Sequence, residues 1–158
     1  MARNMPSLFD GIGPGRWVSV PAVAGLLAIL AMLPPWLPAW AEAIIVHAFA
    51  PVCHQLPARS IHVADTAFAV CDRCFGIYTG AVAGALACRL AMAFKIRAGS
   101  AWMLLGVGAA PAFADWLGPW LGLWTNTPLS RLLTGLWLGG AVAWLLVDAL
   151  RSASSSTR

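Results

Sequence analysis

The sequence predicts an all-α membrane protein with about four transmembrane helices. Of its 158 residues, 60% are apolar and only 10% are charged, whereas a soluble domain carries about 25% charged residues. A spanning helix needs roughly 20 apolar residues, so a chain of this length has room for about four of them. This composition excludes a water-soluble enzyme, a disordered chain and a nucleic-acid-binding module. The lipid bilayer is therefore the first partner that we expect, and nucleic acid is not expected.

The four expected spans are apolar stretches separated by prolines, charges or polar turns. In chain order they are Trp17–Leu33, Cys74–Phe94, Ala101–Asp115 and Leu132–Leu150. The first ends at Pro34-Pro35, because consecutive prolines remove backbone donors and break a helix. A cleavable signal peptide is the alternative interpretation of this first stretch.

A shorter apolar segment, Ala43–Pro51, precedes a Cys-His pair. It is too short to cross a bilayer alone, so it is predicted to be a short re-entrant or interfacial helix. We expect one transmembrane domain over 1–158. Residues 1–16 form a cytoplasmic segment in this prediction, and 151–158 form a disordered Ser-rich tail.

Glycines at four-residue spacing occur in the second and fourth expected spans. Gly76, Gly80 and Gly84 share one helix face, and so do Gly135 and Gly139. Small residues at this spacing allow the backbones of two transmembrane helices to approach closely. The pattern therefore predicts close packing at these two faces.

The distribution of positive charge predicts the orientation in the membrane. Seven of the ten Lys and Arg residues fall in the N-terminal segment, the second connection and the C-terminal tail. The positive-inside rule then places both termini in the cytoplasm. We expect a multi-pass protein of the inner (cytoplasmic) membrane, with the polar motifs on the external face.

A group of cysteines and histidines is the strongest chemical signal in the sequence. Cys53-His54 is followed, after sixteen residues, by Cys71-Asp72-Arg73-Cys74. Three thiolates and one imidazole form a common closed zinc site, so zinc is the expected cofactor. The expected ligands are Cys53, His54, Cys71 and Cys74. His62 or His47 could replace His54 as the nitrogen ligand.

The same Cys-x-x-Cys spacing also suits a membrane thiol–disulfide oxidoreductase. External thiols tend to oxidise, and Arg73 inside the motif favours the thiolate. Multi-span membrane enzymes that form disulfides or reduce vitamin K epoxide have a comparable layout, but they use two cysteine pairs. The remaining cysteine here, Cys88, lies toward the opposite end of its span and is expected to be a bystander.

Three arginines are expected on the same face as the cysteines. Arg59, Arg73 and Arg131 could line an anion pocket, since guanidinium groups match phosphate oxygens in pairs. An anionic lipid head group is the ligand that a membrane interface offers most readily. The ordinary alternative is ion pairing with Asp65, Asp72 and Asp115. Asp115 and Arg131 lie at the ends of adjacent spans, so they are the catalytic candidates and each other's expected partner.

These motifs resemble the signature of a family of small prokaryotic membrane proteins of unknown function. The resemblance rests on Cys-His-Gln-x-Pro-x-Arg-Ser at 53–60, Cys-x-Arg-Cys-x-Gly-Ile-Tyr at 71–78, Asp115, and Arg131 followed by Thr-Gly. It covers roughly residues 45–140, and Asn126 lies two positions away from the family's Asn. It implies a multi-span protein built around these residues, and it brings no activity. Whether the protein is an enzyme, and its oligomeric state, stay open.

Overall fold

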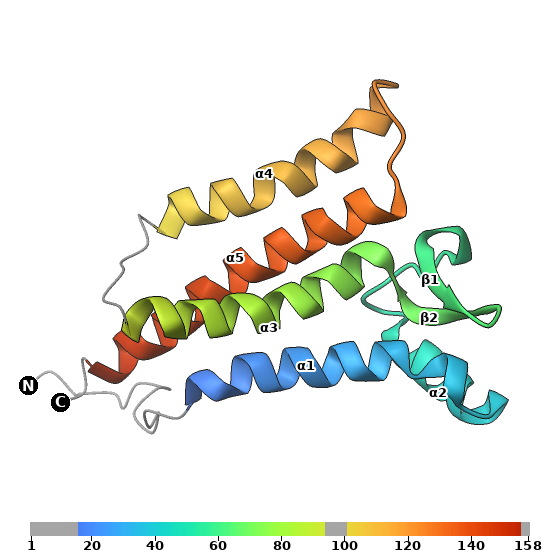
Figure 1. The fold of residues 1–158 in the computed structure, drawn as a ribbon, viewed down its shortest axis with the longest axis horizontal. Helices are drawn as coiled ribbons and strands as arrows, with labels where there is room; N and C mark the ends of the chain where they lie inside the picture. Colours follow the sequence, from blue (N-terminus) through green and yellow to red (C-terminus); the bar gives the residue numbers. More distant parts are fainter. Residues whose placement is uncertain (1–15, 94–100, 156–158) are drawn as a thin grey trace, which may run out of the picture.

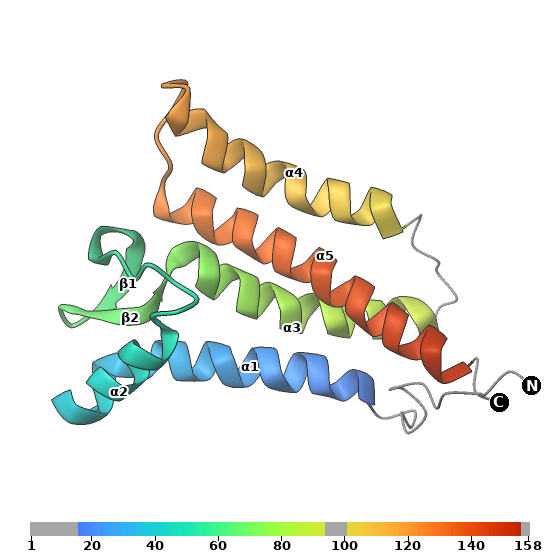
Figure 2. The same cartoon turned by 180° about the vertical axis from the view of Figure 1, so that it is seen from behind.

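Four long helices lie side by side in this protein, with a short helix and a hairpin at one end (Figure 1). The computed structural model describes residues 16–93 and 101–155. The long helices are α1 (Ser19–Met32), α3 (Asp72–Ala93), α4 (Ala101–Trp120) and α5 (Pro128–Ser155). Figure 2 shows the same arrangement from behind, with α3 and α5 between α1 and α4. The beginning of α1 and the end of α5 lie at the same end of the bundle.

Two helices in the described residues are long and apolar enough to cross a membrane, α3 over Asp72–Met92 and α5 over Pro128–Leu150. These support two of the four expected spans. The first expected span is shorter: α1 has 14 residues, about 21 Å at 1.5 Å per residue, against a hydrocarbon core of about 30 Å. The third expected span corresponds to α4, which has 20 residues and contains Pro111, Asp115 and Pro119; it is not one of the two candidate spans.

The short helix that the sequence predicted before the Cys-His pair is present as α2 (Ala39–Phe49). A 3-10 turn, Pro34–Trp36, separates it from α1, because the two prolines end the preceding helix. The side chains of Trp36, Trp40 and Ile44 are exposed in the structure. Exposed aromatic and aliphatic groups of this kind suit a helix that lies at a membrane interface.

A two-stranded antiparallel sheet corrects the all-α prediction. After a 3-10 turn at Pro57–Arg59, strand β1 (Ser60–Val63) pairs with β2 (Thr66–Cys71). Ala64 and Asp65 between them both have positive φ, which is the geometry of a two-residue type I′ hairpin turn. The sequence prediction treated this stretch as a polar connection, because each strand is too short to give a clear alternating pattern.

The α3–α5 contact confirms the prediction from the glycine spacing. A Cβ atom added at Gly76, Gly80 or Gly84 would overlap the backbone of α5, and one at Gly135 or Gly139 would overlap the backbone of α3. The two helices thus approach each other through small residues on both sides. This contact fixes the position of the N-terminal end of α3 relative to that of α5.

Both prolines of α4 leave a carbonyl without its usual helical donor, and each carbonyl has a side-chain donor instead. Pro111 cannot donate to Val107, and Pro119 cannot donate to Asp115. The indole Nε1 of Trp137 donates to the Val107 oxygen at 2.9 Å. The Nδ2 of Asn126 donates to the Asp115 oxygen at 2.8 Å. These two bonds connect α4 with α5 and with the segment before α5.

The remaining differences concern the chain ends. Helix α5 continues to Ser155, into the segment expected to be a disordered tail. The expected cytoplasmic segment 1–16 lies outside the described residues except for its last residue. Phe94, the expected end of the second span, also lies outside the described residues.

Candidate functional site: a cysteine cluster beside a charged network

Three of the four expected metal ligands come together at the end of the bundle that carries α2 and the hairpin. The sulfur atoms of Cys53, Cys71 and Cys74 all lie within 4.8 Å of one another. Two thiolates bound to one tetrahedral zinc are about 3.8 Å apart, from a Zn–S distance of about 2.3 Å. The cluster therefore needs only small adjustments to surround a single ion.

His54, the expected fourth ligand, is not in this cluster, and its side chain is exposed. Neighbouring side chains in a chain diverge, and Cys53 points inward here with only 5% of its surface exposed. His62 is also exposed, and its Nδ1 lies 2.9 Å from the Ser60 carbonyl oxygen. His47, the other alternative, is an exposed residue of α2. The structure thus brings three sulfurs together without a histidine.

Each cysteine is placed by a different element. Cys53 follows α2 in a turn in which its N–H donates to the Phe49 oxygen at 3.0 Å. Cys71 ends β2, and Cys74 lies in the first turn of α3. Because α3 begins directly after β2, the Cys-x-x-Cys motif spans a strand-to-helix junction. The fold therefore brings a segment beyond α2 next to this junction, and three free thiols lie close together there.

Gln55 holds the segment that carries Cys53 in place. Its Nε2 donates to the Val46 oxygen at 2.6 Å and to the Ala69 oxygen at 2.8 Å, which ties this segment to α2 and β2. Its backbone adopts a positive φ of 49°. Gln55 belongs to the motif at 53–60 that carries the family resemblance, but its role was not predictable, because two backbone carbonyls so far apart in the chain cannot be paired from spacing alone.

Cys71 occupies the N-cap position of α3, and its environment favours the thiolate. Its pKa is lowered to about 5, because the Cys74 thiol donates a hydrogen bond to it, and the backbone N–H groups of Cys74 and Arg73 also donate. Its own backbone N–H donates to the Cys53 sulfur at 3.2 Å. Backbone N–H groups that point at sulfur stabilise negative charge there, as at other helix N-termini.

A charged network lies next to the cysteines and connects three helices. Arg73 of α3 forms an ion pair with Asp115 of α4. Arg131 of α5 pairs with Asp72 of α3, with 3.2 Å between Nη1 and Oδ2, and its Nη2 donates to the Asn126 oxygen at 3.1 Å. Asp72 is 2% exposed and Asp115 6% exposed. Buried carboxylates need such partners, since an unpaired charge is costly to desolvate.

This pairing differs from the expected one. Asp115 and Arg131 were expected to be partners, but each pairs with a residue of α3. The adjacent residues Asp72 and Arg73 bind partners on different helices. They lie in the first turn of α3, from which one side chain reaches α5 and the other reaches α4. Asn126 links the two ion pairs, because its Nδ2 also lies 3.1 Å from Asp115 Oδ2. A sequence signal existed for Asn126: Pro119 leaves the Asp115 carbonyl in need of a donor.

The arginines do not form the expected shared anion pocket in this structure. Arg73 and Arg131 contact carboxylates, and Arg59 is exposed on the 3-10 turn before β1. Three buried polar atoms in the network have no hydrogen-bond partner within the described residues: Asp72 Oδ1, Arg73 Nε and Asn126 Oδ1. Such atoms usually pair with ordered water or a ligand.

Comparisons with known proteins agree with the membrane character of the chain. Residues 53–145 match the model of a protein family described as "Predicted membrane protein (DUF2085)". The chain is also 32% identical over 99 residues to the uncharacterized protein MJ1492 of Methanocaldococcus jannaschii, which covers 61% of this chain and 62% of that protein. The match thus leaves more than a third of the relative's length uncovered. No solved structure matches the chain.

Proposed function

The chain belongs to the DUF2085 family of predicted membrane proteins, and on that premise we propose that its three clustered cysteines bind a zinc ion. The single observation that carries this proposal is the mutual proximity of the three sulfur atoms, within 4.8 Å. Zinc suits the site because thiolates are its preferred soft ligands and three of them leave a fourth position for another group. The N–H donors around Cys71 and Cys53 would support the charge of bound thiolates.

Three protein ligands with one further position are typical of catalytic rather than structural zinc. The fourth position would take water or a substrate group, and an ion there could polarise or ionise that group. His54 could complete a closed site only by moving inward from its exposed position. We therefore propose Cys53, Cys71 and Cys74 as the ligands and expect His54 to be dispensable for binding.

Metal analysis of purified variants tests this proposal. The wild-type protein should carry about one zinc per chain, and Cys53→Ala, Cys71→Ala and Cys74→Ala should each lose most of it. Cys88→Ala is the matched control, because Cys88 is buried in a separate cluster with Ala85, Ala143 and Val147. Equal zinc content in all four variants would contradict the proposal. Loss of zinc in His54→Ala would instead support a closed site with His54 as the fourth ligand.

Thiol–disulfide exchange is a second candidate function, favoured by the lowered pKa of Cys71. In this reaction the Cys71 thiolate attacks a disulfide of a client protein, and one client sulfur leaves as a thiolate. Cys74 then attacks the Cys71 sulfur, which releases the second client thiolate and leaves a Cys71–Cys74 disulfide. The client disulfide thereby gains two electrons. Metal-free protein with one oxidised cysteine pair would support this function over zinc binding.

An anionic lipid head group is the third candidate ligand. To bind the guanidinium group of Arg131 or Arg73, the head group would have to displace the carboxylate that pairs with it, Asp72 or Asp115 respectively. Of the buried atoms without a partner among the described residues, Arg73 Nε is a donor that an anionic head group could satisfy, whereas Asp72 Oδ1 and Asn126 Oδ1 are acceptors and need a donor instead. Anionic vesicles that protect the wild-type protein from thermal unfolding, but not Arg131→Lys, would support it. In this proposal Arg131 and Arg73 would contact the head group, and Asp115 would be a carboxylate that the head group displaces.

We also propose that the cysteine cluster faces the external side of the inner membrane, with both termini in the cytoplasm. The charge distribution of the sequence supports this orientation. In intact cells, a membrane-impermeant maleimide should label Cys71 or Cys74 after reduction and chelation. If these cysteines are labelled only in permeabilised cells, the cluster faces the cytoplasm and the proposed orientation is wrong.

A further inference from the structure

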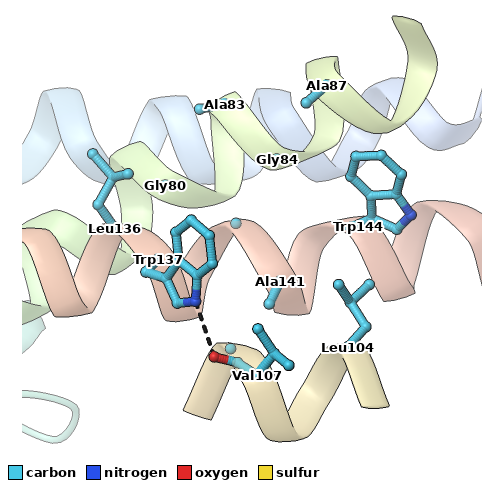
Figure 3. A pocket seen from close by; sticks show the side chains of 12 residues that line it. Gly80, Ala83, Gly84, Ala87, Leu104, Val107, Leu136, Trp137, Ala141 and Trp144 are labelled. Carbon is cyan, nitrogen blue, oxygen red and sulfur yellow. Dashed lines mark hydrogen bonds between the residues drawn. The ribbon is translucent and has the colours of Figure 1, made fainter. Parts of the chain in front are cut away.

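An apolar groove of about 350 Å³ lies between α3, α4 and α5, away from the cysteine cluster (Figure 3). Helix α4 packs against α5 and leaves the side chains of Ala83 and Ala87 on α3 exposed. Leu104 and Val107 of α4 form the opposite wall, and α5 forms the floor. Because α3 and α5 are the two candidate membrane-spanning helices, most of this groove lies at the depth of the bilayer hydrocarbon, and its Trp144 end lies toward the interface, six residues before the end of the α5 span at Leu150.

The chemistry of the groove selects an almost entirely apolar occupant. The only polar side-chain groups among its lining residues are the indole N–H groups of Trp137 and Trp144. Trp137 already donates to the Val107 oxygen, as the dashed line in Figure 3 shows. A ligand with several polar groups would lose its hydrogen bonds to water here without replacement.

The groove offers about 350 Å³ of space and is lined by apolar side chains from all three helices. A hydrocarbon chain is narrow enough to lie along it, and this is what the surrounding bilayer supplies.

One donor at the end of the groove remains available to such a chain. The indole N–H of Trp144 has no hydrogen-bond partner among the residues that the structure describes, and Figure 3 shows its nitrogen on the side farther from Trp137. Ala87 and Leu104 lie at this same end. Leu104 is one turn from the beginning of α4 at Ala101, so this end of the groove lies near the end of the helix bundle.

We propose that the groove binds one acyl chain of a membrane phospholipid, with the ester carbonyl of that chain accepting the Trp144 N–H. The chain packs between Ala83 and Ala87 on one side and Val107 on the other. The bound lipid fills the space between α3 and α4, which make little direct contact. It is a resident lipid with a fixed position and is independent of the metal site.

Photolabelling tests this proposal in nanodiscs that hold one protein each. The probe is a phosphatidylcholine with a diazirine midway along one acyl chain. Label should concentrate on the groove lining, and Ala83→Leu/Ala87→Leu should reduce labelling of Val107 and Trp137 at least fivefold. Ala110→Leu makes the same replacement at one exposed alanine on α4 outside the lining, and it should leave the labelling of Val107 and Trp137 unchanged.

The hydrogen bond to Trp144 has its own test, in detergent-solubilised protein by native mass spectrometry. Trp144→Phe should lower the fraction of protein that retains phosphatidylcholine about two- to tenfold. Trp102→Phe, an exposed tryptophan of α4 outside the groove, is the control. Even labelling of all exposed apolar residues, or no effect of the alanine enlargement, would overturn the lipid site. Disulfide cross-links between two copies of the Ala83→Cys variant would show that a second copy of the protein, and not a lipid, occupies the groove. Unchanged retention in Trp144→Phe would overturn the role of its N–H.

Discussion

The middle and the N-terminal end of α3 contact α5 in contrasting ways. In the middle, glycines let the two backbones touch, and no polar side chain takes part in the contact that Gly80 and Gly84 make. At the N-terminal end, Asp72 and Arg73 bind charged partners on two other helices, and Cys71 and Cys74 face a third sulfur. The first region depends on shape and the second on the pairing of buried charges and thiols. The two regions should therefore respond differently to substitution.

Removal of Arg131 should have the largest effect, at the polar end. Arg131→Ala leaves Asp72, which is 2% exposed, without its ion-pair partner. Loss of one partner of a buried ion pair costs about 3–5 kcal/mol. Chemical unfolding in detergent measures this loss. Arg59→Ala, at an exposed arginine, should change stability little, and Asp72→Asn in the Arg131→Ala background should recover part of the loss. A stability of Arg131→Ala equal to wild type would show that the pair contributes nothing.

Enlargement of Gly80 should have a smaller but clear effect, at the middle of α3. In Gly80→Ala the new Cβ overlaps the backbone of Leu136, so the helices must separate. Overpacking of this kind costs about 1–3 kcal/mol. Gly106→Ala on α4 meets nothing within 4 Å and should be neutral or slightly stabilising. If the two alanine variants unfold at the same denaturant concentration, α3 and α5 do not pack through this face.

The reactivity of Cys71 should show a distinctive pH dependence in reduced, metal-free protein. Its pKa of about 5 keeps it a thiolate from neutral pH down to that value. The rate of iodoacetamide modification at Cys71 should therefore change little between pH 7 and pH 6, and should fall only as the pH drops through about 5. An ordinary thiol loses about tenfold over the same unit, because its thiolate fraction falls tenfold. A tenfold fall in the modification rate of Cys71 between pH 7 and pH 6 would show that the first turn of α3 does not stabilise its thiolate.

The smallest effect concerns the bond between Trp137 and Val107. Trp137→Phe removes one hydrogen bond, with a net cost of about 0.5–1.5 kcal/mol. In a Pro111→Ala background, residue 111 regains the N–H that can donate to Val107, so the same Trp137 substitution should cost less. A double-mutant cycle measures this coupling. Equal costs in both backgrounds would show that the indole does not replace the missing helical donor.

The contrast between the two regions also explains how much could be predicted from the sequence. The glycine contact was predictable, because spacing within one helix determines which residues share a face. The residues of the polar end were also predictable as a group, since Cys53, Cys71, Cys74, Asp115 and Arg131 were all named as candidates. Asp72 and Asp115 were also given as possible partners of the arginines, but which arginine binds which aspartate depends on how α3, α4 and α5 are arranged in space.

Two expected contacts differ from those in the structure. His54 is the expected imidazole ligand that completes a site of three thiolates and one imidazole, but its side chain is exposed and lies outside the cluster. Arg131 was paired with Asp115 because they are the closest opposite charges at that end of the sequence, yet the first turn of α3 offered a partner to each. The hairpin at 60–71 was missed because its strands of four and six residues give too little pattern.

X-ray absorption at the zinc edge tests the central claim most directly. The purified wild-type protein should show three sulfur scatterers at about 2.3 Å and one nitrogen or oxygen scatterer at about 2.0–2.2 Å. The same spectrum should persist in His54→Ala, with the light scatterer retained as solvent. A zinc surrounded only by nitrogen and oxygen, or a protein that binds no zinc while its three cysteines remain reduced, would contradict the account.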